Sequence, residues 1–320
     1  MSNDYRSPLS TLDISFEHYV QRRKAIENRR MSGNGLPNYA FALDYEYRRK
    51  LDSVPQLYNI AKKICATYAS RTLQEINMDG LLAGPQQFPE VYQIGCDCAK
   101  TLGIAIPNIY IVNNQGLNAY TVATDEIEPL IVIYSGLYER FTLGELRCVI
   151  GHECGHIHNQ HTVYNTLSNI LVASGQIATG ILSAQLMNIL TLGSEVLLRT
   201  WSRAAEVTCD RAGMICSERI EDAYNVNAKL MYGGAWGEHE VSLDALKQQL
   251  DMQRQSMTKL NELLYDHPTS VRRILAEKEF AECEIFYQWR PELKQSGMTM
   301  RSREVTDQRC RRIVDVMKKD

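Results

Sequence analysis

The hydrophobic positions of the chain recur first at helical spacing and only later at strand spacing. From Pro55, apolar residues return every three or four positions as far as Tyr68. Pro89 opens a second pattern of the same kind, which runs to Cys98, and proline is favoured at the first position of a helix. Both patterns predict amphipathic helices in the first third of the chain.

The period of the hydrophobic pattern changes beyond these helices. Three short runs rich in β-branched and aromatic residues are separated by Asn, Gly and acidic residues: Ile106–Val112, Leu117–Val122 and Pro129–Tyr134. They predict a small β-sheet of three or four strands. A helical pattern returns after Thr142, where Glu145 three residues later forms the signature of a capping box. We therefore expect an α+β fold that is mostly helical, with a small mixed sheet beside the helix that Thr142 begins.

We expect three units along the chain: an N-terminal arm or helix over residues 1–54, a main domain over 55–280 and a C-terminal helical cap over 281–320. The segment 162–194 contains no charged residue and is long enough to cross a bilayer. Asn, Gln and Gly interrupt it regularly, so it has no continuous apolar run. A helical hairpin within the protein is the favoured interpretation, and membrane contact is the less favoured alternative.

Charge and cysteine content narrow the class of protein. The chain has 35 Lys and Arg against 38 Asp and Glu, a net charge of -3, which gives no electrostatic reason to expect a nucleic-acid partner. Its nine cysteines are an odd number at scattered positions, which is typical of a reducing compartment. The N-terminus has no signal-peptide pattern. These features predict a cytoplasmic protein.

The strongest candidate for chemistry is the stretch G-H-E-C-G-H-I-H-N-Q-H, which begins at Gly151 and holds four of the seven histidines. Each residue of a helix advances by about 100°, so His152 and His156 lie on one face and can bind one metal ion. Glu153 lies beside that face, where its carboxylate can accept a proton from an attacking water. The same count puts the other two histidines, His158 and His161, on the far side, so we expect them to point away from the metal.

A catalytic zinc site takes three protein ligands and leaves one position to water, so a third ligand must come from elsewhere in the chain. The positions three and six beyond His156 are Asn159 and Thr162, which excludes the histidine of the longer metzincin pattern. Glu206 and Asp210 are four residues apart, on one face of a later helix. We expect Glu206 to be the third ligand and Asp210 to accept the outer ring N–H of a ligand histidine. The alternative is a solvated acidic pair.

These motifs, in this order, resemble those of the zinc metallopeptidases that include HtpX and the CAAX prenyl endopeptidases, a gluzincin group with H-E-x-x-H followed by E-x-x-x-D on a later helix. The resemblance covers roughly residues 90–276. It rests on Asn118–Tyr120, Ser135–Leu137, Glu145–Leu146, His152–His156, Ser202–Arg203, Glu206, Asp210 and Asp266–Ile274.

The resemblance implies one Zn²⁺ per chain, held by His152, His156 and Glu206. It implies that Glu153 is the general base and then the general acid of peptide hydrolysis. The expected function is a zinc-dependent endopeptidase with a peptide or protein substrate. A zinc-stabilised module that binds peptides without cutting them is the alternative. The membrane members carry N-terminal transmembrane helices that this chain lacks, which predicts a soluble branch of the family.

The resemblance also implies roles for residues outside the metal-binding helices. Asn118, Ala119 and Tyr120 match an edge strand on which a substrate pairs through its backbone. His267 matches a loop near the metal, where it would contact the oxyanion of the reaction or approach the zinc in a resting form; helix capping before a proline is the alternative. Arg203 is expected to anchor the helix of Glu206 or neighbouring carboxylates; contact with the substrate is the less favoured alternative.

Overall fold

The computed structural model of the chain describes residues 36–54, 56–123, 128–168, 192–233, 242–255 and 268–315. Its strands are β1 (Leu81–Leu82), β2 (Asn108–Val112), β3 (Ala119–Val122) and β4 (Leu130–Tyr134). Its helices are α2 (Ala42–Asp52), α3 (Leu57–Asp79), α4 (Pro89–Leu102), α5 (Ser135–Arg140), α6 (Leu143–His158), α9 (Leu192–Cys216), α10 (Ile220–Tyr232), α11 (Leu243–Gln255), α13 (Ser270–Ala281), α14 (Glu284–Trp289), the 3₁₀ helix η2 (Pro291–Leu293) and α15 (Arg303–Val314). The mostly helical α+β class is confirmed.

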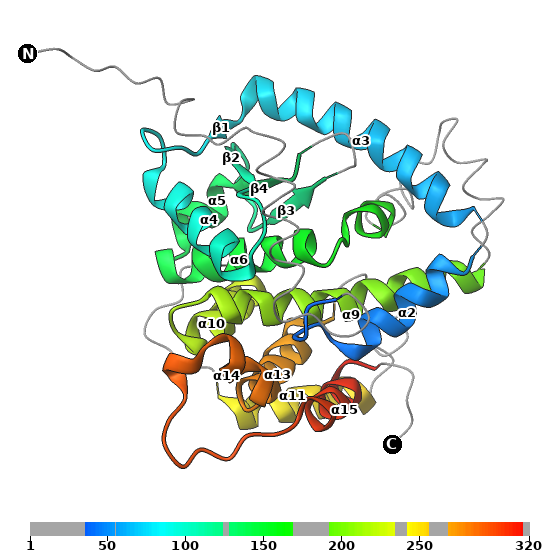
Figure 1. The fold of residues 1–320 in the computed structure, drawn as a ribbon, viewed down its shortest axis with the longest axis vertical. Helices are drawn as coiled ribbons and strands as arrows, with labels where there is room; N and C mark the ends of the chain where they lie inside the picture. The colour runs from blue at the N-terminus through cyan, green and yellow to red at the C-terminus, as the bar shows by residue number, and fades with distance from the viewer. Residues whose placement is uncertain are drawn as a thin grey trace, which may run out of the picture.

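The strands form one mixed sheet in the order β1-β2-β4-β3, in which β2 and β4 are parallel and the other pairs are antiparallel. Helix α3 lies along the sheet at the top of the view in Figure 1, where its Ala69 and Ile76 pack against Val122 and Val132. The alternate side chains of β2 and β4 face the opposite way, toward α4 and α6. The central strands β2 and β4 therefore lie between two helical layers, and β1 and β3 form the two edges of the sheet.

Helix α6 begins where the sequence predicts. The Thr142 hydroxyl accepts the backbone N–H of Glu145, and the Glu145 carboxylate accepts the backbone N–H of Thr142, so the capping box is confirmed. Lys229 of α10 donates to the same carboxylate at 2.6 Å, and both side chains are buried. This ion pair fixes the beginning of α6 against α10.

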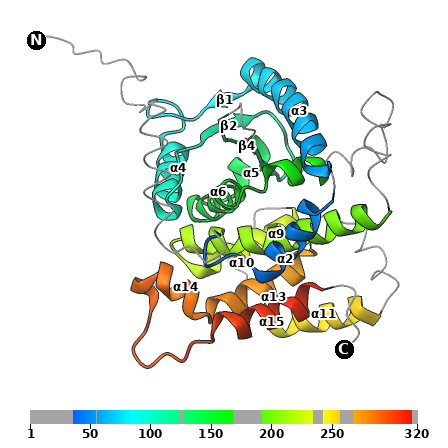
Figure 2. The same ribbon diagram turned by 45° about the vertical axis from the view of Figure 1, so that its right-hand side comes forward.

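Helices α6 and α9 lie side by side at the centre of the molecule (Figures 1 and 2), and their backbones approach closely at glycines. A Cβ atom at Gly151 would lie 2.5 Å from Cys216 Cβ, and one at Gly155 would lie 2.8 Å from Ala212 Cβ. Gly213 of α9 faces α6 just as closely, since its Cβ would lie 2.8 Å from a backbone oxygen there. Three glycines therefore allow the approach that places residues of α9 beside the histidines of α6.

The termini of the described chain pack on α9. Phe41 and Leu43, at the beginning of α2, share a hydrophobic cluster with Ala204 and Val207 of α9 and with Cys310 of α15. In Figure 2, α13, α14 and α15 lie below α9, on the side away from the sheet. The boundaries predicted at residues 54 and 280 stay predictions.

The uncharged segment 162–194 falls mostly outside the described residues. Residues 162–168 are helical and 169–191 are not described, so the predicted hairpin stays a prediction. None of the helices in the described part of the chain is long and apolar enough to cross a membrane.

Candidate metal centre

The two histidines of the H-E-x-x-H pattern face one carboxylate of α9. His152 Nε2 lies 3.5 Å from Glu206 Oε2, and His156 Nε2 lies 3.4 Å from Glu206 Oε1. Ligand bonds of about 2.1 Å in a tetrahedral zinc site separate neighbouring ligand atoms by about 3.4 Å. The donor set and its spacing therefore fit a metal ion held by all three side chains, as the sequence predicts.

Besides the Glu206 carboxylate, the Cys209 thiol is a candidate ligand near the two histidines. One ligand atom each from His152, His156 and Cys209 lie within 4.8 Å of one another. Cys209 Sγ, however, lies 3.5 Å from His161 Nδ1, which is itself 3.3 Å from the Nδ1 of His156 rather than the Nε2 that faces Glu206. Burial raises the pKa of the Cys209 thiol. Glu206 as the third ligand stays a prediction.

The outer nitrogen of His152 faces a charged pair. His152 Nδ1 lies 3.0 Å from Asp210 Oδ1, the contact expected for Asp210, and Arg273 of α13 donates to both oxygens of Asp210. Arg273 Nη1 also lies 3.7 Å from Glu206 Oε2. Burial acts to raise the pKa of Asp210, but Arg273 and His152 lower it below its ordinary value. Asp210 is thus a carboxylate that can hold the Nδ1–H tautomer of His152, which presents Nε2 to a metal.

The same carboxylates act on the charge of the metal-free His152. Burial alone would lower the pKa of its imidazole, yet the hydrogen bonds with Asp210 and Glu206 raise that pKa to about 10. The metal-free site therefore favours a protonated His152, and a metal ion must replace that proton when it binds.

Glu153 is buried next to the sheet and is held by a strand residue. The Thr121 hydroxyl of β3 lies 2.7 Å from Glu153 Oε2, to which it donates, and 3.2 Å from the backbone oxygen of Glu153. This contact orients the carboxylate expected to act as the base. The sequence motif predicts a role for Asn118–Tyr120 and does not extend to Thr121.

The expectation that His161 points away from the metal is wrong. Helix α6 ends at His158, and Gln160 adopts a left-handed conformation with φ of 56°, so the helical count does not extend to His161. The chain turns back, the His161 N–H donates to the His156 oxygen at 3.0 Å, and His161 Nδ1 lies 3.3 Å from His156 Nδ1. His158 does face away from the metal, toward Tyr39, whose hydroxyl is 3.0 Å from its Nδ1.

A buried aspartate of α2 lies behind His161. His161 Nε2 is 2.9 Å from Asp44 Oδ2, and both side chains are almost fully buried. Burial acts to raise the pKa of Asp44, but His161 and a hydrogen bond from Thr208 lower it below its ordinary value. Burial likewise lowers the pKa of His161 against the attraction of Asp44. The arrangement is thus a neutral His161 imidazole in contact with the Asp44 carboxylate.

The remaining predicted residues occupy different parts of the molecule. Asn118 accepts the N–H of Tyr134 at 3.0 Å, and Ala119 and Tyr120 begin β3 at the sheet edge. Arg203 is buried in α9, where it donates to Thr200 of the same helix at 3.0 Å. His267 lies outside the described residues. The roles given to these five residues stay predictions.

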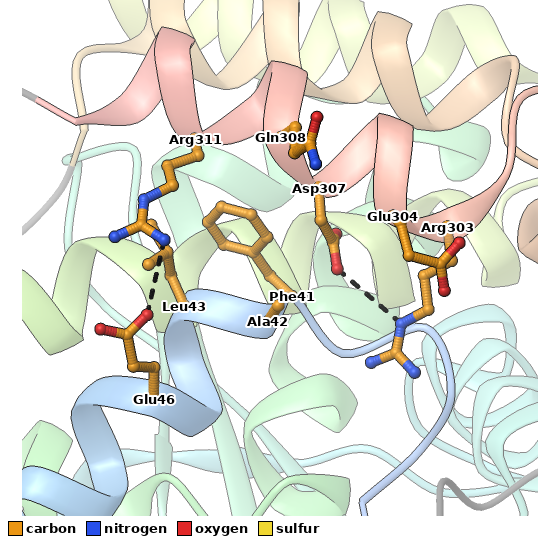
Figure 3. A pocket seen from close by; sticks show the side chains of 9 residues that line it. All are labelled: Phe41, Ala42, Leu43, Glu46, Arg303, Glu304, Asp307, Gln308 and Arg311. Carbon is orange, nitrogen blue, oxygen red and sulfur yellow. Dashed lines mark ion pairs between the residues drawn. The ribbon is translucent and has the colours of Figure 1, made fainter.

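A pocket of about 340 Å³ lies elsewhere, between α2 and α15 (Figure 3). Ion pairs bridge residues that line it, Arg311 to Glu46 at 3.6 Å and Arg303 to Asp307 at 3.8 Å. None of the predicted site residues lines this pocket.

Comparison with known proteins places these residues in a family. The model of peptidase family M48 matches residues 85–280, which include α6, α9, β3 and Arg273. The plastoglobule-localized metallopeptidase 48 of Arabidopsis thaliana chloroplasts is 28% identical over 207 residues, which are 62% of this chain and 57% of that protein. Protease HtpX of Legionella pneumophila (strain Corby) is 31% identical over 78 residues, 24% of this chain and 28% of that protein. The chain thus spans little more than half of the plant relative and less than a third of the bacterial one.

Among solved structures, the crystal structure of S. mikatae Ste24p is 15% identical with a TM-score of 0.41, over 73% of this chain and 61% of that one. A similarity of that size supports no argument about function. The family match spans residues 85–280, more than half of the chain, and includes His152, His156 and Glu206. This protein belongs to peptidase family M48.

Proposed function

We propose that the protein is a zinc-dependent metalloendopeptidase that hydrolyses bonds within peptides or proteins. The observation that carries the proposal is the position of Glu206, whose two carboxylate oxygens lie 3.5 and 3.4 Å from the Nε2 atoms of His152 and His156. The family match and the metallopeptidase and protease names of its relatives support the same reaction.

Zinc is the metal that this donor set suits best. Two imidazoles and one carboxylate are a ligand set of catalytic zinc sites, in which one position stays open to water. When bound, zinc would lower the pKa of water and polarise the scissile carbonyl. The proposal therefore includes one Zn²⁺ per chain, with His152, His156 and Glu206 as its ligands.

Glu153 transfers the protons of the hydrolysis reaction. It follows His152 directly on α6, and its Oε2 accepts the Thr121 hydroxyl at 2.7 Å. A carboxylate fixed in this way can take a proton from the attacking water and later give it to the leaving amine. General acid–base groups of this kind contribute about 10²- to 10⁴-fold to the rate.

The substrate is proposed to pair with β3. The N–H of Tyr134 donates to the oxygen of Asn118, and the register pairs Ala119 with Ile133, so the backbone groups of Ala119 and Thr121 point away from β4. A peptide added at this edge would bond to those two residues, while Tyr120 bonds within the sheet. Since Thr121 also holds Glu153, the strand would place the scissile bond beside the base.

The test is peptide-library digestion by wild-type and Glu153→Gln proteins of measured zinc content, with and without a chelator. Wild type should cleave and lose activity with the chelator, while Glu153→Gln keeps its zinc and loses cleavage. Glu139→Gln is the matched control, because Glu139 is exposed on α5, away from the metal. Cleavage that persists in Glu153→Gln would overturn the assignment. Zinc and peptide binding without any cleavage would instead favour the non-catalytic binding module.

A further inference from the structure

We propose that Asp44 and His161 position the ligand His156 through a chain of buried hydrogen bonds. Asp44 lies on α2, before the family-matched residues 85–280, so this segment would complete the metal site. The proposal rests on the zinc site described above.

The direction of each hydrogen bond follows from the metal. A neutral imidazole that binds zinc through Nε2 carries its proton on Nδ1, so His156 Nδ1–H must donate. Its acceptor is His161 Nδ1, 3.3 Å away. His161 then carries its own proton on Nε2 and donates it to Asp44 Oδ2 at 2.9 Å. With zinc on the Nε2 side of His156, every donor in this chain meets an acceptor.

The surroundings of Asp44 fix its role as an acceptor. Its Oδ1 accepts the indole N–H of Trp201 at 2.9 Å, and its Oδ2 accepts the hydroxyl of Thr208 at 2.8 Å. That hydroxyl accepts the N–H of Phe41 at 3.1 Å, so its own proton is directed to Asp44. A buried carboxylate with three donors is set to receive a proton from His161 and not to give one.

The rest of this segment holds the end of α6. Arg48 donates to the backbone oxygen of Asn159 at 2.6 Å, and the Tyr39 hydroxyl bonds both the Asn159 amide and His158. None of these contacts is made to His156. Tyr39 therefore offers a control: its loss weakens the same packing and leaves the path from Asp44 to His156 intact.

Cys209 is the one competitor for the His161 lone pair among the described residues, with its Sγ 3.5 Å from Nδ1. Cys209→Ala removes this competitor at little cost in volume. If His161 serves His156, zinc affinity should stay equal or rise in this variant. If Cys209 were a ligand, affinity would fall.

The test compares zinc dissociation constants, measured by chelator competition on purified full-length chains, with the melting temperatures of the metal-free proteins. His161→Phe keeps the ring shape and removes both nitrogens, and Asp44→Asn keeps the shape but places an amide N–H against a donor. Loss of an outer partner of a metal ligand costs about 10- to 100-fold in affinity, and we expect this for His161→Phe with a smaller loss for Asp44→Asn. Tyr39→Phe should lower the melting temperature and leave zinc affinity unchanged.

The outcomes separate this proposal from the proposed function. Wild-type zinc affinity in both His161→Phe and Asp44→Asn overturns the proposal, and so does an equal loss in Tyr39→Phe. Should His161→Phe fail to fold, Asp44→Asn decides, supported by the visible spectrum of the Co²⁺-loaded protein, which changes only if the ligand geometry changes. If replacement of His156 left the zinc affinity of the chain unchanged, the zinc site itself would be refuted.

Discussion

The two proposed ligand histidines lie one turn apart on α6, yet their outer nitrogens meet different surroundings. His152 Nδ1 faces Asp210 directly, and Arg273 neutralises that aspartate. His156 Nδ1 faces a second imidazole, His161, which passes the contact on to Asp44. On the His156 side the carboxylate is Asp44, which reaches the ligand only through His161. Its other partners are hydroxyl and indole groups instead of a guanidinium.

The difference teaches that neighbouring ligands can depend on different parts of the chain. The partners of His152 come from α9 and α13, within the family-matched residues. Those of His156 come from the turn after α6 and from α2, whose Asp44 lies 117 residues before His161 in sequence. An aspartate in direct contact with a ligand histidine interacts with its charge. An aspartate that acts through a second imidazole mainly orients the ligand ring. We therefore expect changes near His152 to have the larger effects.

The largest effect should come from Glu206→Ala. Glu206 contacts both histidines, so its removal affects both sides of the site at once. Zinc affinity should fall by more than the about 10- to 100-fold expected for an outer partner. The measurement is zinc content after dialysis together with chelator competition. Glu195→Ala, on the same helix but half-exposed and paired with Arg199, should bind zinc as wild type does. Wild-type zinc binding in Glu206→Ala would leave Cys209 as the third ligand.

Asp210→Asn tests the His152 side alone. It leaves the buried guanidinium of Arg273 without its main partner and His152 without a charged acceptor, so zinc affinity should fall by about 10- to 100-fold. Titration with a chelator measures it, and the loss should exceed that of Asp44→Asn. The control is Asp97→Asn, which breaks an arginine pair at a more exposed site. If the two sides respond equally, the comparison is wrong.

Gly155→Ala tests the approach of the two helices. Alanine would favour the helix by about 1 kcal/mol. Its Cβ, however, would lie 2.8 Å from Ala212 Cβ, and overpacking of this kind costs about 1–3 kcal/mol. We expect a lower free energy of unfolding in urea and a weaker zinc site. Gly84→Ala, where nothing lies near the new Cβ, should be neutral. Unchanged zinc affinity in Gly155→Ala would show that the spacing of α6 and α9 tolerates a methyl group.

The smallest effect concerns Glu277 of α13, a buried carboxylate whose charge interacts with His152 and Asp210. Burial, followed by the charge of Asp210, raises the pKa of Glu277 well above its ordinary 4.5. A raised pKa adds stability that is complete below the ordinary value and is lost as pH rises through the folded value. Glu277→Gln can still accept the Asn227 amide, so its melting temperature should exceed that of wild type increasingly as pH rises from 4.5. Parallel pH profiles in chelator-treated protein would contradict this.

Much of the site follows from spacing along single elements. His152, Glu153 and His156 are set by the helical period of α6, and the capping box predicts where that helix begins. Glu206 and Asp210 share a face of α9 for the same reason. The three strand runs appear within a few residues of their predicted ends, because alternation and β-branched content report burial directly. The short β1 was not named beforehand, since two exposed leucines form no pattern.

The contacts that sequence reasoning missed depend on where one element ends or on which elements meet. His161 was assigned to the wrong side because the helix ends three residues before it and Gln160 reverses the chain. Thr121 and Asp44 carry no signal of their own, since a threonine in a strand and an aspartate in the first turn of a helix are ordinary residues. Arg273 stands in the quoted Asp266–Ile274 motif, but nothing local assigns it to Asp210.

By itself, the sequence determined the fold class, the helix that carries the H-E-x-x-H pattern and the residue types of a candidate metal site, because each depends on local periodicity and on ligand chemistry. Only the tertiary structure decided which groups stand behind the ligands. Those pairings depend on the close approach of α6 and α9 at three glycines and on the packing of α2 against α9. Such contacts arise between segments far apart in the chain, where no spacing rule operates.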